Sequence, residues 1–284
     1  MLQDHKFPVS FKPFLASAAP REGPLSHKEA RELSAAIMPD FADEATRIVE
    51  RAQEKGIVMR VMGATVIRKH CPKFLHLHTA MKRALTDIDF MTYSKFNPSI
   101  KPLFIELGYA SDDRFNAYFG MMRQQYSDPA NHRMADVFFD QLEMCHTLDF
   151  RGRLGFDSPT ITLADFLLEK MQIVQLNEKD KIDSVVLLRE HEIGDSDNET
   201  INAQYISKLL AKDWGFYYTV TTNLGKIKEY ARSSMTEEDS RDVVAKTDHL
   251  TERIENEPKT TGWKMRARVG PKKRWYRDVE EVIR

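Results

Sequence analysis

Two aspartates, Asp87 and Asp89, stand two positions apart in the stretch Leu85–Met91. If this stretch is a strand, its side chains alternate between the two faces, so both carboxylates share one face while Ile88 and Phe90 enter the core. Neighbouring carboxylates repel each other. A divalent cation with its nucleotide phosphates would offset that repulsion, since Mg²⁺ is usually held by one or two protein carboxylates. The alternative is a pair of aspartates at the solvated edge of a strand.

A third acid, Asp136, lies in a second strand-like run, His132–Phe139, beside Val137 and Phe138. A partly buried carboxylate among such neighbours needs a cation or hydrogen-bond donors. Two carboxylates from one strand and one from a neighbouring strand would make a two-metal site for phosphoryl transfer.

The elements before the first acids have the order helix, strand, glycine turn and helix. An apolar face predicts a helix over residues 41–55, and a strand over residues 57–62 follows it. Gly63 and Ala64 then form a turn into a helix over residues 65–70. This order brings backbone N–H groups and the positive end of a helix towards an anion. The alternative for Gly63 is a simple tight turn.

Further elements lie between the acids and after them. The pattern predicts a helix over residues 98–108 and a hairpin strand over residues 115–126, whose aromatic and methionine side chains we assign to the core. A turn at residues 128–131 leads into the strand of the third acid, and short strands and turns are expected over residues 144–158.

The second half of the chain begins with a helix that Thr162 caps, running to residue 174. Lys170 lies at the border of its apolar face, so it either extends its ammonium to solvent or reaches a nucleotide phosphate. The next helix begins at Asn177, and its Asp180 and Asp183 share one face. By composition alone they are solvated acids of a first turn.

Three more helices, over residues 201–212, 214–230 and 236–255, predict a C-terminal helical bundle. Beyond it, residues 259–277 contain eight Lys and Arg and no Asp or Glu. Alternating apolar and basic residues followed by a Gly-Pro turn predict a basic β-hairpin. It would bind nucleic-acid phosphates and stack bases, or be an edge hairpin with solvated cations and inward tryptophans. Its proposed RNA-binding cations are Lys264, Arg266, Arg268, Lys272, Lys273 and Arg274.

Composition describes an ordinary soluble chain of 284 residues, 42% hydrophobic and 30% charged, with a net charge of −1. No apolar run approaches bilayer length, and residues 1–24 lack the apolar segment of a signal peptide. We therefore expect a cytoplasmic protein without a membrane partner. Cys71 and Cys145 are too few for a disulfide framework or a zinc cluster, and Cys145 beside His146 is expected to be packed.

Two sets of residues give this chain a family resemblance. Gly63-Ala64, Asp87-x-Asp89 and Asp136 in this order resemble the nucleotidyltransferase superfamily. The stretches 167–170 and 178–183, Leu-Leu-Glu-Lys and Glu-Lys-Asp-x-x-Asp, are similar to motifs of AbiEii-type abortive-infection and toxin nucleotidyltransferases, and of prokaryotic proteins identified only as nucleotidyltransferase family members. The resemblance covers about residues 40–230. It implies an α+β fold, a nucleotidyltransferase-like mixed sheet flanked by helices, followed here by the helical region and the basic hairpin.

We expect the chain to divide into an arm and helix (1–40), a nucleotidyltransferase-like core (41–160), a helical domain (161–258) and a basic tail hairpin (259–284).

The resemblance also implies a role for each matching residue. Asp87, Asp89 and Asp136 would bind Mg²⁺ or Mn²⁺, and Asp136 would help to activate the attacking hydroxyl. The remaining roles concern the nucleotide or the acceptor: Gly63 and Ala64 would contact the triphosphate of an NTP, Lys170 would contact phosphate, and Asp183 with Asp180 would position the phosphate or the acceptor.

Two departures from the family pattern stand out. Ala64 replaces the usual Gly or Ser and removes a hydroxyl contact, and the gap from Gly63 to Asp87 is long and basic.

The expected reaction transfers NMP from NTP to an acceptor hydroxyl. The basic tail favours RNA, such as tRNA in toxin relatives, over a small molecule or a protein, and a toxin would have an antitoxin partner. The alternative function is a non-catalytic regulatory protein that binds nucleotide or RNA on the same fold.

Overall fold

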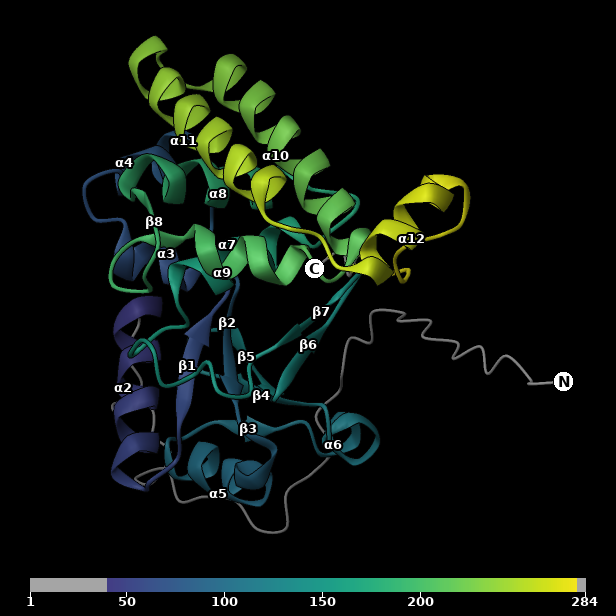
Figure 1. The fold of residues 1–284 in the computed structure, drawn as a ribbon. Coiled ribbons are helices and arrows are strands. Elements are labelled where there is room, and N and C mark those ends of the chain that lie inside the picture. Colours follow the sequence, from purple (N-terminus) through teal and green to yellow (C-terminus); the bar gives the residue numbers. More distant parts are fainter. Residues whose placement is uncertain (1–39, 280–284) are drawn as a thin grey trace, which may run out of the picture.

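The computed structural model describes residues 40–279, which form an α+β fold around a mixed five-stranded sheet flanked by helices. The strand order is β1-β2-β5-β4-β3. In Figure 1 the sheet occupies the middle of the molecule, and the long helices α10 and α11 lie side by side beyond it at the top. The expected helix before Pro39 lies outside the described residues.

The central strands agree with the sequence pattern. β2 (Asp87–Thr92) pairs antiparallel with β1 (Met59–Met62) and parallel with β5 (Arg133–Phe139). On the other side, β5 pairs antiparallel with β4 (Arg123–Asp128), and β3 (Ala110–Ser111) forms the edge. The predicted strands around Asp87 and Asp136 are therefore confirmed, and they are neighbours.

One face of the sheet is covered by α2 (Phe41–Glu54) and α5 (Asn97–Glu106), both predicted as helices. Ile48 from α2 and Phe104 from α5 are fully buried in a core that also holds Phe90 of β2. Burial of large apolar side chains of this kind contributes about 1.5–3 kcal/mol each. This core fixes β2 from behind, on the face opposite its two aspartates.

The other face of the sheet packs against helices from the second half of the chain. Met62 and Met91, on the same face as the acids, belong to one apolar core with α7 (Leu163–Met171) and α8 (Glu178–Glu190). Two short helices between β1 and β2 join this layer, α3 (Thr65–His70) and α4 (Leu75–Ala80). The sheet and the helices after residue 160 therefore share one core.

The three predicted C-terminal helices are confirmed as α9 (Ala203–Leu210), α10 (Trp214–Ser234) and α11 (Glu237–Asn256). Thr236 caps α11, because its side chain accepts the N–H of Asp239. The remaining short elements are η1 (Ser94–Phe96), β6 (Gln141–Glu143), β7 (Thr147–Asp149), β8 (Ile193–Gly194) and β9 (Ile201–Asn202).

Two predictions were wrong. Of the expected hairpin strand over residues 115–126, only the end from Arg123 is a strand, since α6 (Asp113–Phe119) precedes β4. The side chain of Asp112 accepts the N–H of Phe115 and so caps that helix. The expected core role of residues 115–126 is confirmed for Tyr126, which is fully buried, but it is wrong for Tyr118 and Met121, which are 76% and 79% exposed.

The predicted basic hairpin is also absent from the described residues. Instead α12 (Thr261–Val269) is a helix, followed by the 3₁₀ turn η2 (Gly270–Lys272). Thr260 caps α12, and its Trp263 contacts Tyr217 of α10 at 5.0 Å between ring centroids. The strand prediction relied on the alternation of apolar and basic residues. The contacts that hold this segment on α10 come instead from Trp263 and Arg266, which are three positions apart, as on one face of a helix.

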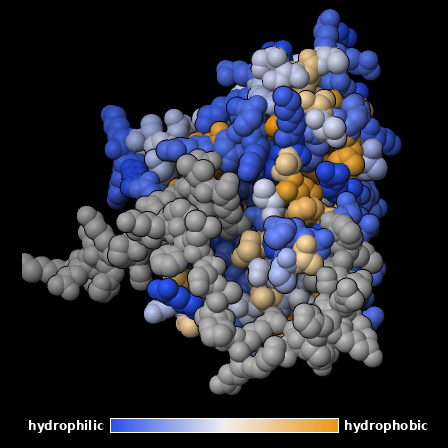
Figure 2. Space-filling model, turned by 180° about the vertical axis from the view of Figure 1, so that it is seen from behind, coloured by the Kyte–Doolittle hydropathy of each residue, from blue (hydrophilic) through white to orange (hydrophobic). Residues whose placement is uncertain are grey.

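The surface agrees with this burial of apolar side chains. Seen from behind, the described residues present mostly hydrophilic side chains, with hydrophobic ones in small groups (Figure 2). Between residues 40 and 279, no helix combines the length and the apolar content that a bilayer span requires.

Candidate metal centre on the central sheet

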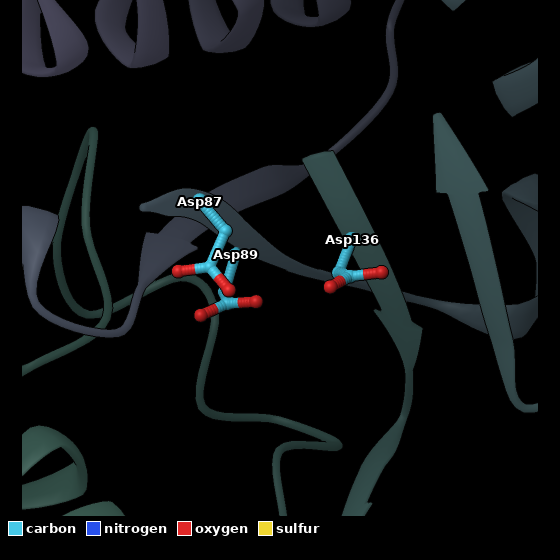
Figure 3. A group of neighbouring side chains, drawn as sticks. All are labelled: Asp87, Asp89 and Asp136. Atoms are coloured by element: carbon cyan, nitrogen blue, oxygen red, sulfur yellow. The ribbon is translucent and has the colours of Figure 1, made fainter. Parts of the chain in front are cut away.

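Asp87, Asp89 and Asp136 lie together on one face of the sheet. Asp89 and Asp136 are register partners on the parallel strands β2 and β5, and Asp87 lies two positions before Asp89 on β2. One carboxylate oxygen from each of the three lies within 4.8 Å of the others. Figure 3 shows Asp87 and Asp89 projecting from β2 towards the same side as Asp136 of the neighbouring strand. The sequence prediction that the structure would bring these acids together is confirmed.

The three acids repel one another electrostatically. Loss of solvent raises the pKa of Asp89 well above its usual range, and Asp87, Asp136 and Glu169 raise it further. The guanidinium of Arg123 acts in the opposite direction. A divalent cation would remove this repulsion, and three carboxylates form the hard oxygen donor set that Mg²⁺ or Mn²⁺ prefers. The residues present therefore fit such a metal.

Arg123 is a site residue that the sequence reasoning missed. Its Nη2 lies 2.6 Å from Oδ2 of Asp136 and its Nε lies 3.2 Å from Oδ1, so the guanidinium donates hydrogen bonds to both oxygens. No sequence pattern indicated this pair, because it depends on the β4–β5 register, in which Arg123 faces Phe138, two positions from Asp136.

Gly63 lies against the acids because it has no side chain. Its φ is +70°, a region that L residues rarely adopt, and a Cβ at this position would be 2.6 Å from Oδ2 of Asp89. Its N–H donates to Oε2 of Glu169 at 3.1 Å. The turn is therefore more than a simple tight turn, because the Gly63 N–H is hydrogen-bonded to the Glu169 carboxylate. That N–H is then already used and does not point to a phosphate in this structure. Ala64 precedes α3 and makes no side-chain cap.

Lys170 is buried, so the interpretation that it extends to solvent is wrong. Its Nζ lies 3.3 Å from Glu169, 3.4 Å from Asp183 and 3.7 Å from Asp180. Burial alone would lower the pKa of Lys170, but these three carboxylates outweigh burial and raise it. The ammonium is therefore charged and enclosed by acids.

Asp183 and Asp180 are likewise buried, at 0% and 9% exposed, rather than solvated acids of a first turn. Arg83 donates to both oxygens of Asp183 at 2.8 and 2.9 Å, and Nε2 of His78 lies 3.1 Å from Oδ1. Burial would raise the pKa of Asp183, but Lys170, His78 and Arg83 together hold it below its usual range. For Asp180, burial dominates and raises the pKa.

Glu169 connects the three acids of the sheet with the buried group of Lys170, Asp180 and Asp183. It accepts the N–H of Gly63 beside the acids of the sheet, and its other oxygen faces Lys170. Burial raises the pKa of Glu169, which Lys170 partly offsets. The sequence places Glu169 next to Lys170, but only the packing of α7 on the turn reveals its contact with Gly63. The candidate site is thus one continuous network from Asp136 to Asp183.

The predicted RNA-binding cations of the tail divide into two groups. Arg266 is used internally, since it donates to the carbonyls of Gly270 and Lys273 and stacks on Trp214 at 4.5 Å. Arg274 pairs with Asp278. Lys264, Arg268, Lys272 and Lys273 have exposed side chains, and none of these side chains makes such a contact with another residue between 40 and 279.

The end of the basic segment (residues 259–277) is hydrogen-bonded to α10 and to the loop between β6 and β7. The indole N–H of Trp275 donates to Oγ1 of Thr219 at 3.0 Å, and the N–H of Arg277 donates to the carbonyl of Cys145 at 3.0 Å. His146 lies beneath this contact, with Nε2 2.8 Å from the same Thr219 hydroxyl. Cys145 is thus packed, as predicted, and His146 is a buried histidine as well.

Comparisons with protein-family models, with curated proteins and with solved structures gave no match to this chain.

Proposed function

We propose that this protein is a nucleotidyltransferase that moves a nucleoside monophosphate from an NTP to an acceptor hydroxyl, with Mg²⁺ or Mn²⁺ as its metal. The observation that supports the proposal is the convergence of Asp87, Asp89 and Asp136 from two parallel strands, with their oxygens within 4.8 Å. The unfavourable ionisation of Asp89 adds to this support, since a divalent cation would relieve it.

Asp87, Asp89 and Asp136 would hold the metal. When bound, Mg²⁺ supplies charge neutralisation and alignment to phosphoryl transfer. In the proposed reaction the acceptor oxygen forms a bond to the α-phosphorus, and the bond from that phosphorus to the bridging oxygen breaks. Pyrophosphate leaves, and Asp136 accepts the proton of the acceptor hydroxyl.

The network behind the acids would support the nucleotide. Glu169 fixes the Gly63–Ala64 turn against Asp89, and Lys170 holds Glu169 in place. Asp180 and Asp183 hold the ammonium and so position it.

The proposed acceptor is RNA. The exposed cations Lys264, Arg268, Lys272 and Lys273 lie on residues 259–277, a segment whose last residue, Arg277, is hydrogen-bonded to Cys145 between β6 and β7. Cations of this kind bind phosphate backbones without regard to sequence. A toxin-like role in the cytoplasm, with an antitoxin as partner, completes the proposal and rests on the sequence resemblance.

The test incubates the purified full chain with Mg²⁺, each α-labelled NTP in turn and total cellular RNA. Wild type and Asp149→Asn, an exposed acid outside the site, should both label RNA, while Asp89→Asn should not. Equal labelling by Asp89→Asn would refute the proposal. NTP binding that depends on Mg²⁺, but without transfer to RNA, would move the search to small-molecule or protein acceptors. Absence of both binding and transfer would favour the non-catalytic alternative.

A further inference from the structure

Apolar side chains are exposed where α6 leads into β4. Tyr118, Met121 and Met122 are 76%, 79% and 60% exposed, the highest values among the large hydrophobic side chains of residues 40–279. They lie at the end of α6 and in the turn before β4, at the outer edge of the molecule in Figure 1. We call these three side chains the α6 patch. Exposed apolar side chains that gather in one place are typical of a surface that binds a partner.

The α6 patch lies beside the candidate metal centre. Arg123 follows Met122 directly in the chain and donates hydrogen bonds to Asp136. The guanidinium carbon of Arg123 also lies 5.6 Å from the ring centroid of Phe115, which is three positions before Tyr118 on α6. A partner that covers the patch therefore borders the candidate site on the side of Asp136.

The α6 patch is too small to hold a separate protein firmly. Three side chains of about 150–250 Å² each offer less than the roughly 800 Å² per partner that a stable complex of two chains buries. A contact of this size is sufficient when its partner belongs to the same chain, because a tether keeps that partner at an effective concentration in the millimolar range. The size of the patch therefore favours a segment of this protein as its occupant.

The chain before Asp40 contains a segment of matching chemistry. Residues 7–15, which lie outside the described residues, read Phe-Pro-Val-Ser-Phe-Lys-Pro-Phe-Leu and include three phenylalanines but no acid. Each proline fixes its own φ, so an extended segment of this kind loses less chain entropy on docking. Proline-rich segments dock on surfaces with exposed aromatic rings such as that of Tyr118, and methionine side chains adapt to an irregular partner.

The tether has the length that this docking needs. Asp40 lies near one end of the β4–β5 pair, where its carbonyl accepts from Arg133, the register partner of Asp128. The patch precedes Arg123 at the other end of β4, so the two points are roughly 20–30 Å apart. Residues 16–39 connect them, and a flexible chain of these 24 residues has a root-mean-square length of about 25–30 Å. The effective concentration is highest when the tether length matches the span in this way.

We propose that residues 7–15 dock on the α6 patch of their own chain, with their phenylalanines packed against Tyr118, Met121 and Met122. The docked segment borders the candidate metal centre, through the contact of α6 with Arg123. This inference goes beyond the proposed function and does not depend on it, because it concerns only contacts within the chain.

The test replaces Tyr118 with the photo-crosslinking amino acid p-benzoylphenylalanine in the full chain and maps cross-links by mass spectrometry after irradiation. Without RNA, the cross-link should join position 118 to residues 7–15 of the same chain. Phe11→Ser combined with Phe14→Ser should remove it. The matched control carries the same amino acid in place of Phe156, an aromatic residue that is 59% exposed, and should not capture residues 7–15.

A second measurement follows chymotrypsin cleavage after Phe11 and Phe14 in chains of natural residues only. Cleavage should be several-fold faster in Tyr118→Ser combined with Met121→Ser than in wild type, because the segment is no longer docked. Phe156→Ser should be cleaved at the wild-type rate. The substituted side chains of the patch are exposed, so the fold should persist, which thermal unfolding checks.

The other outcomes would overturn the inference. A cross-link between two chains, visible as a dimer on a denaturing gel, would assign the patch to a second copy, and one that forms only with added RNA would assign it to RNA. No cross-link, capture of the segment from position 156 as well, or equal cleavage of wild type and the patch variant would show that the segment does not dock there. None of these results bears on the metal centre, so each would leave the proposed function standing.

Discussion

Gly63 and Asp89 are so close that a single methyl group on Gly63 would overlap the carboxylate. The ideal Cβ position is 2.6 Å from Oδ2 of Asp89, and the backbone at Gly63 has a φ of +70°. The residue type at position 63 and the position of the acid are therefore coupled. A second glycine, Gly56, has nearly the same φ of +71° but nothing within 4 Å of its Cβ position, so it provides a natural comparison.

Gly63→Ala should abolish tight Mn²⁺ binding, because the methyl group displaces Asp89. Gly56→Ala should leave binding intact. Both variants should lose about 1–2 kcal/mol of folding free energy from the left-handed backbone conformation. Urea denaturation measures the common loss, and Mn²⁺ titration measures the difference. Unchanged Mn²⁺ binding in Gly63→Ala would show that the turn does not fix Asp89.

Asp89→Asn should not destabilise the protein in the absence of metal, although it should remove metal binding. Burial and the carboxylates of Asp87 and Asp136 raise the pKa of Asp89, so its charge opposes folding at neutral pH. The expected gain in free energy of unfolding is on the order of 1 kcal/mol. Urea denaturation in a chelator measures it, with Asp149→Asn as the exposed control. A loss of stability would contradict this account of the charges.

Lys170→Met should cost about 3–5 kcal/mol, because it leaves buried carboxylates without their ammonium partner. Lys101→Met removes an exposed pair with Asp113 and should cost less than about 1 kcal/mol. The free energy of unfolding of both variants is measured in urea at pH 7. Similar losses in the two would show that Lys170 is not held as the structure indicates.

His146 should make the protein less stable in mild acid. Burial lowers its pKa to about 4, whereas an unfolded histidine has a pKa of about 6.5. Between these values the unfolded chain binds a proton that the folded chain does not, so stability is full above pH 6.5 and falls towards pH 4. The expected contribution is up to about 3 kcal/mol.

The measurement is the difference in pH dependence between wild type and His146→Gln in urea. The variant should lose less stability between pH 6.5 and 4, while His249→Gln, an exposed histidine, should follow wild type. Parallel curves for all three proteins would contradict a neutral, buried His146.

The tail lysines should account for RNA affinity without affecting the fold. Replacing Lys264, Lys272 and Lys273 by Gln should weaken RNA binding and reduce the slope of log affinity against log salt by about 0.7 for each RNA phosphate that is no longer neutralised. Replacing three exposed lysines elsewhere, Lys55, Lys101 and Lys208, provides the control with the same change in charge. Equal weakening in both triple variants would assign the effect to net charge and not to the tail.

The strands β1, β2 and β5 could be predicted from the sequence, because they are short and largely apolar, whereas the polar β4 was predicted only in part and the two-residue β3 was not predicted. The alternation around Asp87 and Asp89 placed both on one face, and the run around Asp136 had the length of a strand. What the alternation cannot show is register, and register is what places Arg123 beside Asp136.

The helical half was predicted less completely where charge and burial conflict. Lys170, Asp180 and Asp183 are of types that are rarely buried, so composition favours solvent for each of them. They are buried because they neutralise one another across α7 and α8 and because Arg83 and His78 reach them from near α4. No local sequence pattern indicates ion pairs between residues that are so far apart in the chain. The tail was mispredicted for a similar reason, since its packing partner α10 is remote in the sequence.

The parallel pairing of β2 with β5 also has a consequence for how the protein acquires its proposed activity. Along the chain these two strands are separated by η1, α5, β3, α6 and β4. Distant segments pair only after a large loss of chain entropy, so pairings of this kind are slow to form. We therefore expect the cation to bind only when the central sheet is complete. A chain still emerging from the ribosome, or one with β5 detached, would carry all three aspartates and yet be inert.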